Sequence, residues 1–142
     1  MNKLAFIGGT GVYDAGILSD IRSEIINTPF GQAVCQIGYF KGKEIVFLAR
    51  HGTGHNIPPH KINYRANIYA LKMLEVSSIV STTAVGSLNP EYKPGELVLI
   101  DQFLDMTKSR NGTFFDGEFR GVAHIDVTNP YCQTLRLSLI HI

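Results

Sequence analysis

The sequence is poor in the residues that build disulfide scaffolds, zinc sites and membrane spans. Its two cysteines, Cys35 and Cys132, cannot form a multi-bridge framework, and neither has a cysteine or histidine partner at zinc-like spacing. No apolar run reaches membrane-spanning length, and the run at 4–7 is too short for a signal-peptide core. A reduced, cytoplasmic protein without a membrane partner is therefore expected.

An excess of charge of one sign is also missing. Thirteen Lys and Arg residues stand against twelve Asp and Glu residues, so the net charge is +1. This balance argues against a nucleic-acid partner or an anionic membrane surface, but it leaves room for a small local anion site. With 44% hydrophobic residues among its 142, the chain can bury one domain-sized core.

Apolar patterns along the chain predict short strands and one long helix. Strands are expected at 3–7, 33–39, 44–49, 78–83 and 97–100, with Gly42 in the turn of a hairpin between the second and the third. Apolar residues recur at helical spacing over 63–75, and a further helix is expected after Pro130. The polar segment 107–121, which carries three phenylalanines, is expected to be a long functional loop.

These elements predict an α/β fold with a mixed, mostly buried sheet flanked by helices. One long helix is too little cover for a sheet that is buried on both faces. The last segment, 137–142, lies inside a helical pattern and carries no cap signal. We therefore expect residues 1–142 to be a domain that is incomplete at its C-terminus.

Three short segments follow predicted strands, which is where open α/β sheets place their ligands. In the first, Gly8 to Gly11, glycines free backbone N–H groups to face an anion, and Thr10 adds a hydroxyl. The segment lacks the third glycine of the dinucleotide fingerprint and the Gly-Lys-Ser/Thr of a P-loop. A strand-to-loop turn without any ligand is the alternative.

The other two segments add side-chain donors. Arg50 can hold a phosphate through a fork of two hydrogen bonds, and His51 can donate to the same anion or titrate. The segment 82–87 combines threonine hydroxyls with a glycine that permits close backbone approach. The alternatives are an Arg50–carboxylate pair beside a hydrogen-bonded His51, and threonines that merely favour a strand. Together the three segments suit one oxyanion, most simply inorganic phosphate.

The sequence offers neither a nucleophile motif nor a metal site. It has no Gly-x-Ser-x-Gly elbow, and neither cysteine has a motif context. His51, His55 and His60 are close in sequence, but the last two lie in a proline-containing loop without the spacing of a zinc site. No metal is therefore expected.

Several longer motifs, in order, resemble the N-terminal part of the 5′-methylthioadenosine phosphorylase family, within the purine nucleoside phosphorylase superfamily. They extend from about residue 4 to about residue 132 and comprise the segments 7–11, 50–52, 57–68, 82–88, 94–103, 115–117 and 121–125. The segment 137–142 departs from the family pattern. The resemblance implies a nucleoside phosphorylase-like fold, with residues 1–142 as the N-terminal portion of a single domain.

The resemblance also implies a reaction of purine and methionine salvage, in which phosphate attacks C1′ of 5′-methylthioadenosine to give adenine and 5-methylthioribose 1-phosphate. Inorganic phosphate is then a co-substrate, no further cofactor is expected, and the assembly is a homotrimer. By residue-by-residue match, the phosphate ligands are Thr10, Arg50, His51, Thr83 and Ala84. Gly86 would let the backbone pass close to the nucleoside, and His124 would reach a neighbouring subunit's site near the 5′ substituent.

The family's purine-contacting and base-protonating acidic residues match nothing in this sequence, so no catalytic residue is assigned. The preferred base, adenine or the 6-oxopurine of methylthioinosine or another purine nucleoside, depends on those positions. The segments 81–88 and 101–107 favour the methylthioadenosine type. The remaining alternatives are an inactive fragment that binds phosphate or nucleoside, and a purely structural α/β fragment.

Overall fold

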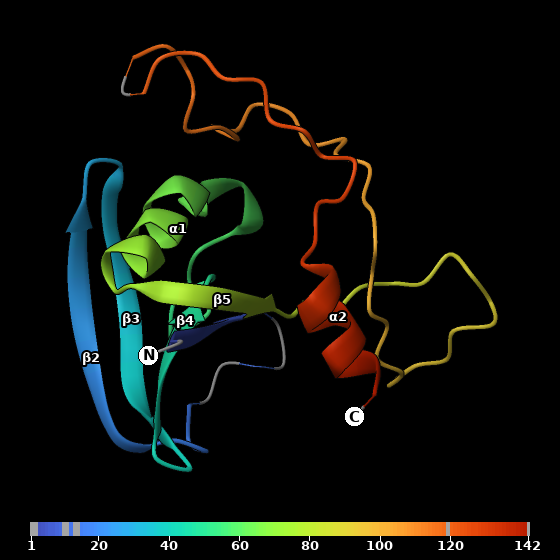
Figure 1. Ribbon diagram of the computed structural model, residues 1–142, viewed down its shortest axis with the longest axis horizontal. Helices are drawn as coiled ribbons and strands as arrows, with labels where there is room; N and C mark the ends of the chain where they lie inside the picture. Colours follow the sequence, from blue (N-terminus) through green and yellow to red (C-terminus); the bar gives the residue numbers. More distant parts are fainter. Residues whose placement is uncertain (1–2, 10–11, 13–14, 119, 142) are drawn as a thin grey trace. The chain divides into compact units, whose positions relative to one another are not determined.

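The computed structural model describes residues 3–9, 12, 15–118 and 120–141. The chain divides into two units, Met1–Val85 and Gly86–Ile142, and each is described by itself. The first unit contains a five-stranded sheet and an α-helix (Figure 1). The second consists mainly of irregular backbone and carries one helix.

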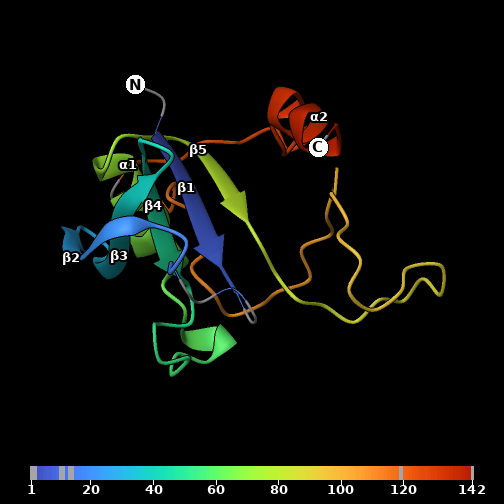
Figure 2. The same ribbon diagram turned by 90° about the horizontal axis from the view of Figure 1, so that it is seen from below.

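The sheet of the first unit is mixed. Its strands are β1 (Lys3–Gly8), β2 (Ser19–Thr28), β3 (Gly31–Phe40), β4 (Lys43–Ala49) and β5 (Val76–Ser81), in the spatial order β2-β3-β4-β1-β5. β1 pairs in parallel with both β4 and β5, whereas β3 pairs antiparallel with β2 and β4. The carboxyl ends of β4, β1 and β5 therefore lie at one edge of the sheet (Figure 2). The predicted α/β class is confirmed.

Two hairpins form the antiparallel side of the sheet. The predicted hairpin between β3 and β4 is confirmed, and its turn residues Lys41 and Gly42 have φ of 49° and 75°, as a two-residue turn of type I′ requires. β2 is absent from the sequence predictions because charged residues interrupt its apolar positions and most of its side chains are exposed. The turn after it contains Pro29 and then Gly31, which has φ of 115°. That turn is the signal that could have revealed the strand.

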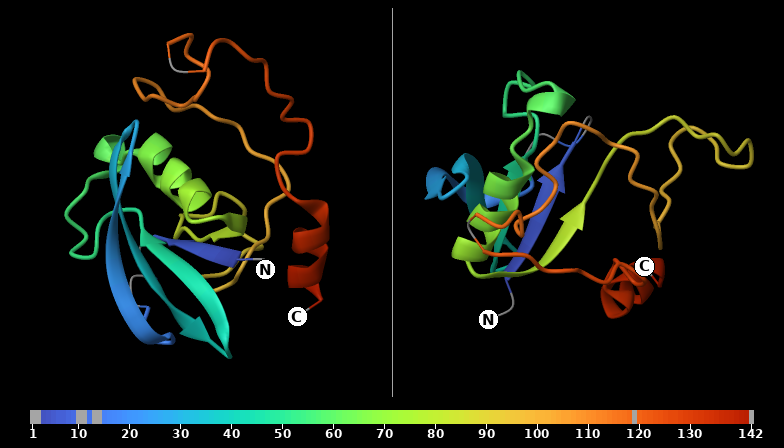
Figure 3. Two further views of the ribbon diagram at one scale, coloured as in Figure 1. Left: turned by 60° about the vertical axis from the view of Figure 1, so that its left-hand side comes forward. Right: turned by 90° about the horizontal axis from the view of Figure 1, so that it is seen from above.

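The predicted helix over 63–75 is confirmed as α1 (Tyr64–Met73), which follows a short 3-10 turn, η1 (Pro59–Lys61). Asn63 caps α1, because its Oδ1 accepts the Ala66 N–H at 3.0 Å. Its Nδ2 donates to the Phe30 carbonyl at 2.6 Å, so the same side chain ties the helix start to the β2–β3 turn. The helix lies across one face of the sheet, in contact with β2, β3 and β5 (Figure 3).

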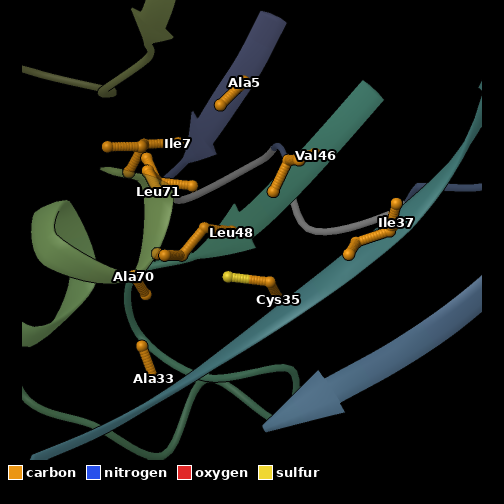
Figure 4. Close-up of a cluster of buried hydrophobic side chains, with 9 residues drawn as sticks. All are labelled: Ala5, Ile7, Ala33, Cys35, Ile37, Val46, Leu48, Ala70 and Leu71. Atoms are coloured by element: carbon orange, nitrogen blue, oxygen red, sulfur yellow. The ribbon is translucent and has the colours of Figure 1, made fainter. Parts of the chain in front are cut away.

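The core of the first unit lies between α1 and the sheet. Figure 4 shows side chains from β1, β3, β4 and α1 that converge on this layer. The cluster consists of Ala5, Ile7, Ala33, Cys35, Ile37, Val46, Leu48, Ala70 and Leu71, each at most 9% exposed. Burial of these apolar side chains stabilises the strands that carry the candidate site.

In the second unit the predicted C-terminal helix is confirmed as α2 (Gln133–Ile140). The prediction of a buried strand at 97–100 is wrong. That segment is irregular, and Leu97 is 99% exposed and Ile100 54% exposed. A strand requires a hydrogen-bonding partner, and within the described ranges no strand pairs with this segment. The predicted loop over 107–121 contains no helix or strand among its described residues. No helix in the described part of the chain is long and apolar enough to cross a membrane.

Candidate functional site

The three segments singled out in the sequence emerge from three adjacent strands. Gly9 follows β1, Arg50 follows β4, and Thr82 follows β5. Two backbone hydrogen bonds extend the parallel pairing beyond the strand ends, since the Arg50 N–H donates to the Gly8 carbonyl at 3.2 Å and the Thr82 N–H donates to the Ile7 carbonyl at 3.0 Å. The central position of β1 therefore brings segments that are far apart in sequence to one place, at the carboxyl ends of the strands where open α/β sheets bind their ligands.

Two hydrogen bonds to the segment after β5 fix the Arg50 guanidinium. Its Nη1 donates to the Thr82 carbonyl at 2.5 Å, and its Nη2 donates to Thr83 Oγ1 at 2.9 Å. Two bonds from the two terminal nitrogens of a planar group determine both its position and its plane. Arg50 itself is half-buried. The structure thus places a fixed cation at the shared edge of β4, β1 and β5.

This arrangement leaves donors, not acceptors, for a ligand to engage. A guanidinium has five N–H donors, and the two bonds to Thr82 and Thr83 leave three not engaged by these residues. Thr83 Oγ1 already accepts from Arg50, so its own O–H remains as a donor. A group with several acceptor oxygens and negative charge satisfies both, because charge-assisted hydrogen bonds to guanidinium are short and strong.

The packing at the end of β1 leaves no room for a side chain on Gly8. A Cβ on Gly8 would lie 2.7 Å from the Phe47 ring and would collide with the Val12 carbonyl, so the fold requires a glycine there. The Val12 N–H donates to the Gly9 carbonyl at 2.9 Å. Thr10, predicted as a phosphate ligand, lies outside the described residues.

Among the predicted ligands that the structure describes, His51 is the one with a buried polar side chain, at 7% exposure. Its Nδ1 lies 2.9 Å from the Ile57 carbonyl, and because a carbonyl oxygen only accepts, Nδ1 carries the hydrogen of this bond. The Ile57 N–H in turn donates to the His51 carbonyl at 2.9 Å, and the His55 ring lies 4.9 Å from the His51 ring. A hydrogen bond from His51 to an anion would need a second ring hydrogen, on Nε2, and that contact stays a prediction.

The other predicted site residues lie in exposed, irregular backbone. Ala84 comes directly after Thr83 in the first unit. Gly86 and His124 belong to the second unit, and among the described residues nothing beyond its chain neighbours lies within 4 Å of a Cβ built on Gly86. Their roles toward a nucleoside stay predictions. Among the described residues, no three His, Cys, Asp or Glu side chains form a group that could hold a metal ion.

Sequence reasoning missed two contributors to the site. The Thr82 carbonyl binds Arg50, but a backbone acceptor leaves no signal in a sequence. The Thr82 side chain shows a different feature, because its Oγ1 is buried and has no hydrogen-bond partner within the described part of the chain. Gly9 is the second: it belongs to the glycine segment singled out in the sequence, but only the packing around it shows that the Arg50 guanidinium occupies the space of its missing side chain.

The fold and the site define a class of protein: an α/β protein with a guanidinium and a hydroxyl fixed together at the carboxyl ends of its parallel strands. Comparison with known families identifies the class further. Residues 3–141 match the model of the Phosphorylase superfamily, and the chain belongs to this family.

Individual relatives agree with this assignment. The chain is 55% identical over 146 residues to a probable 6-oxopurine nucleoside phosphorylase of Thermococcus kodakarensis, a match that covers 99% of this chain and 55% of the relative. It is 52% identical to an S-methyl-5′-thioadenosine phosphorylase of Hyperthermus butylicus, over 96% of this chain and 50% of the relative. The structure of methylthioadenosine phosphorylase from Schistosoma mansoni in complex with adenine matches with a TM-score of 0.92 at 36% identity, over 99% of this chain and 53% of that one. The chain thus spans about half the length of the relatives it matches.

Proposed function

We propose that this chain forms the phosphate-binding part of a purine nucleoside phosphorylase, whose reaction is the phosphorolysis of 5′-methylthioadenosine to adenine and 5-methylthioribose 1-phosphate. The observation that carries the proposal is the pair of hydrogen bonds from Arg50 to Thr82 and Thr83 where β4, β1 and β5 end together. Relatives and solved structures that bear the name methylthioadenosine phosphorylase support the choice of nucleoside.

The chemistry requires a positioned anion more than a covalent nucleophile. An oxygen of hydrogen phosphate forms a bond to C1′ while the C1′–N9 bond breaks. The base leaves with the electron pair, and in the net reaction it takes up the proton that hydrogen phosphate loses. Positive charge grows on the ribose ring during this exchange, as in other glycosyl transfers. A phosphate held beside C1′ stabilises that charge and then captures it. Arg50 and Thr83 would hold the phosphate, together with Thr10, His51 and Ala84.

Phosphate binding to the chain itself is the first test. Isothermal titration with phosphate is expected to show saturable binding, which Arg50→Ala weakens by about tenfold or more, because a hydrogen-bonded charge contact is lost. Arg22→Ala is the matched control. Arg22 lies on β2, an outermost strand of the sheet, and pairs with Glu24 and Glu44. Equal affinities of wild type and Arg50→Ala would refute the phosphate site.

Turnover is tested in a protein of the relatives' length. Two chimeras would join this chain to the remaining part of the Thermococcus kodakarensis relative or of the Hyperthermus butylicus relative. We expect phosphate-dependent release of free base from both, measured by chromatography, with adenine from 5′-methylthioadenosine in the second. A folded chimera that binds phosphate but releases no base would favour the alternative of a binding module without turnover.

A 6-oxopurine nucleoside is the second candidate substrate, and one observation favours it. The relatives named 6-oxopurine nucleoside phosphorylase reach 55% identity to this chain, slightly above the 52% of the relative named for methylthioadenosine. Identity over this half does not separate the two, because the family residues that contact the base match nothing in this sequence. We therefore expect the base preference of each chimera to follow its added half.

The homotrimer is part of the same proposal. Leu88, Leu97, Leu104 and Met106 of the second unit are each at least 85% exposed. Large apolar side chains left this exposed are available to an interface with another chain. Light scattering of the chimeras tests the assembly, with a mass of three chains expected and a monomer as the contradicting result.

A further inference from the structure

We infer that Gly9 is a positioning residue for Arg50: its missing side chain provides the space in which the guanidinium lies. This inference rests on the proposed function, because it assigns Gly9 to the same oxyanion site. A Cβ built on Gly9 would lie 2.5 Å from Cζ and from Nη1 of Arg50, and closer still to Nη2. Ordinary van der Waals contact begins at 3.4 Å. The guanidinium therefore occupies the volume of the absent methyl group.

The backbone at this position does not itself demand a glycine. The φ of Gly9 lies outside the left-handed range, in contrast to Gly42 or Gly52, so alanine can adopt the same conformation. The atoms in the way are the far end of one long, flexible side chain, which can move without disturbing the sheet. Gly8 differs, since its Cβ would meet the Val12 carbonyl and the Phe47 ring. The two neighbouring glycines thus have different roles: Gly8 permits the packing at the end of β1, and Gly9 leaves space for the Arg50 guanidinium.

A methyl group at residue 9 would displace the guanidinium by at least about 0.9 Å, the difference between 3.4 Å and the 2.5 Å to Cζ and Nη1, and Nη2 lies closer still. A shift of this size breaks the 2.9 Å bond to Thr83 Oγ1, which would stretch toward ~3.8 Å and out of hydrogen-bonding range. The bond between Nη1 and the Thr82 carbonyl is subject to the same shift. Arg50 would keep its charge but lose the two contacts that set its plane.

The experiment combines Gly9→Ala with Arg50→Lys in a double-mutant cycle, read out as the Kd for inorganic phosphate. Lysine keeps the charge but lacks the planar fork that needs the space, so Gly9→Ala is expected to weaken binding about tenfold beside Arg50 and less than about twofold beside Lys at residue 50. Gly54→Ala is the control, because nothing lies within 4 Å of its Cβ and its φ lies outside the left-handed range. The midpoint temperature of thermal unfolding is expected to stay close to that of wild type in Gly9→Ala and to fall in Gly8→Ala.

The outcomes separate this inference from the function on which it rests. Wild-type affinity in Gly9→Ala, or an equal loss in both backgrounds, would overturn the positioning role while the phosphate site stands. Wild-type affinity in Arg50→Ala would overturn the phosphate site itself. A large loss of thermal stability in Gly9→Ala, without the dependence on Arg50, would show that the glycine serves the fold.

Discussion

Removal of the Thr83 hydroxyl tests the site at the atom that both binds Arg50 and can donate to an oxyanion. Thr83 Oγ1 accepts the Arg50 Nη2 hydrogen at 2.9 Å, and its own O–H is available to donate to an oxyanion. Thr83→Val keeps the shape but removes both interactions. A lost hydrogen bond to a charged group costs about 1.5–3 kcal/mol, so the Kd for phosphate should rise about 10- to 100-fold. Thr83 is exposed, and the thermal midpoint should therefore change little.

The assay is isothermal titration of wild type, Thr83→Val and Thr83→Ser with phosphate. Serine retains the hydroxyl without the methyl group, so its affinity should stay within a few-fold of wild type. A valine variant that binds like wild type would refute the role of the hydroxyl. A serine variant as weak as the valine variant would show that the shape of the side chain, and not its hydrogen bonds, supports binding.

Three further predictions concern the stability of the fold and the reactivity of its cysteines. Thr82→Val removes a buried hydroxyl that has no partner in the described structure, so the free energy of unfolding in urea should rise by about 1 kcal/mol; a fall would contradict this account. Hydrogen bonds from Lys3 and Arg22 hold the pKa of the Glu44 carboxyl below its ordinary value of 4.5. Their contribution to stability is thus present above that value and is lost as the pH falls through the lowered pKa, so acid should destabilise wild type more than Glu44→Gln in pH-dependent melts. Burial raises the pKa of the Cys35 thiol to about 11, so a thiol reagent should modify Cys132 alone in the native protein and both cysteines after denaturation.

Local patterns were sufficient to predict most of the elements of the first unit. The glycine after Phe6-Ile7 ends β1 as expected, and the apolar spacing of 63–75 corresponds to α1. These signals are local, because hydrophobic periodicity and turn residues act on neighbouring positions. The strand predicted at 97–100 failed for the opposite reason. An apolar run indicates a strand only where a partner strand supplies its hydrogen bonds, and Leu97 to Ile100 have none within the described structure.

The site was predictable as a set of residues but not as an arrangement. Sequence placed Arg50 after a strand and Thr83 at the end of one, and the family resemblance assigned both to phosphate. The spatial order β4-β1-β5 and the hydrogen bond between the two side chains depend on long-range pairing, which no local pattern encodes. The hydrogen bond from Arg50 to the Thr82 carbonyl and the space that Gly9 leaves for the guanidinium likewise exist only in the folded chain.

The central claim is that the turns after β1, β4 and β5 hold one oxyanion. A crystal structure of this chain grown with phosphate tests it most directly. The account predicts one phosphate whose oxygens lie within hydrogen-bonding distance of both the Arg50 guanidinium and Thr83 Oγ1. A phosphate bound elsewhere, with the Arg50–Thr83 bond unchanged and no anion beside it, would contradict the account.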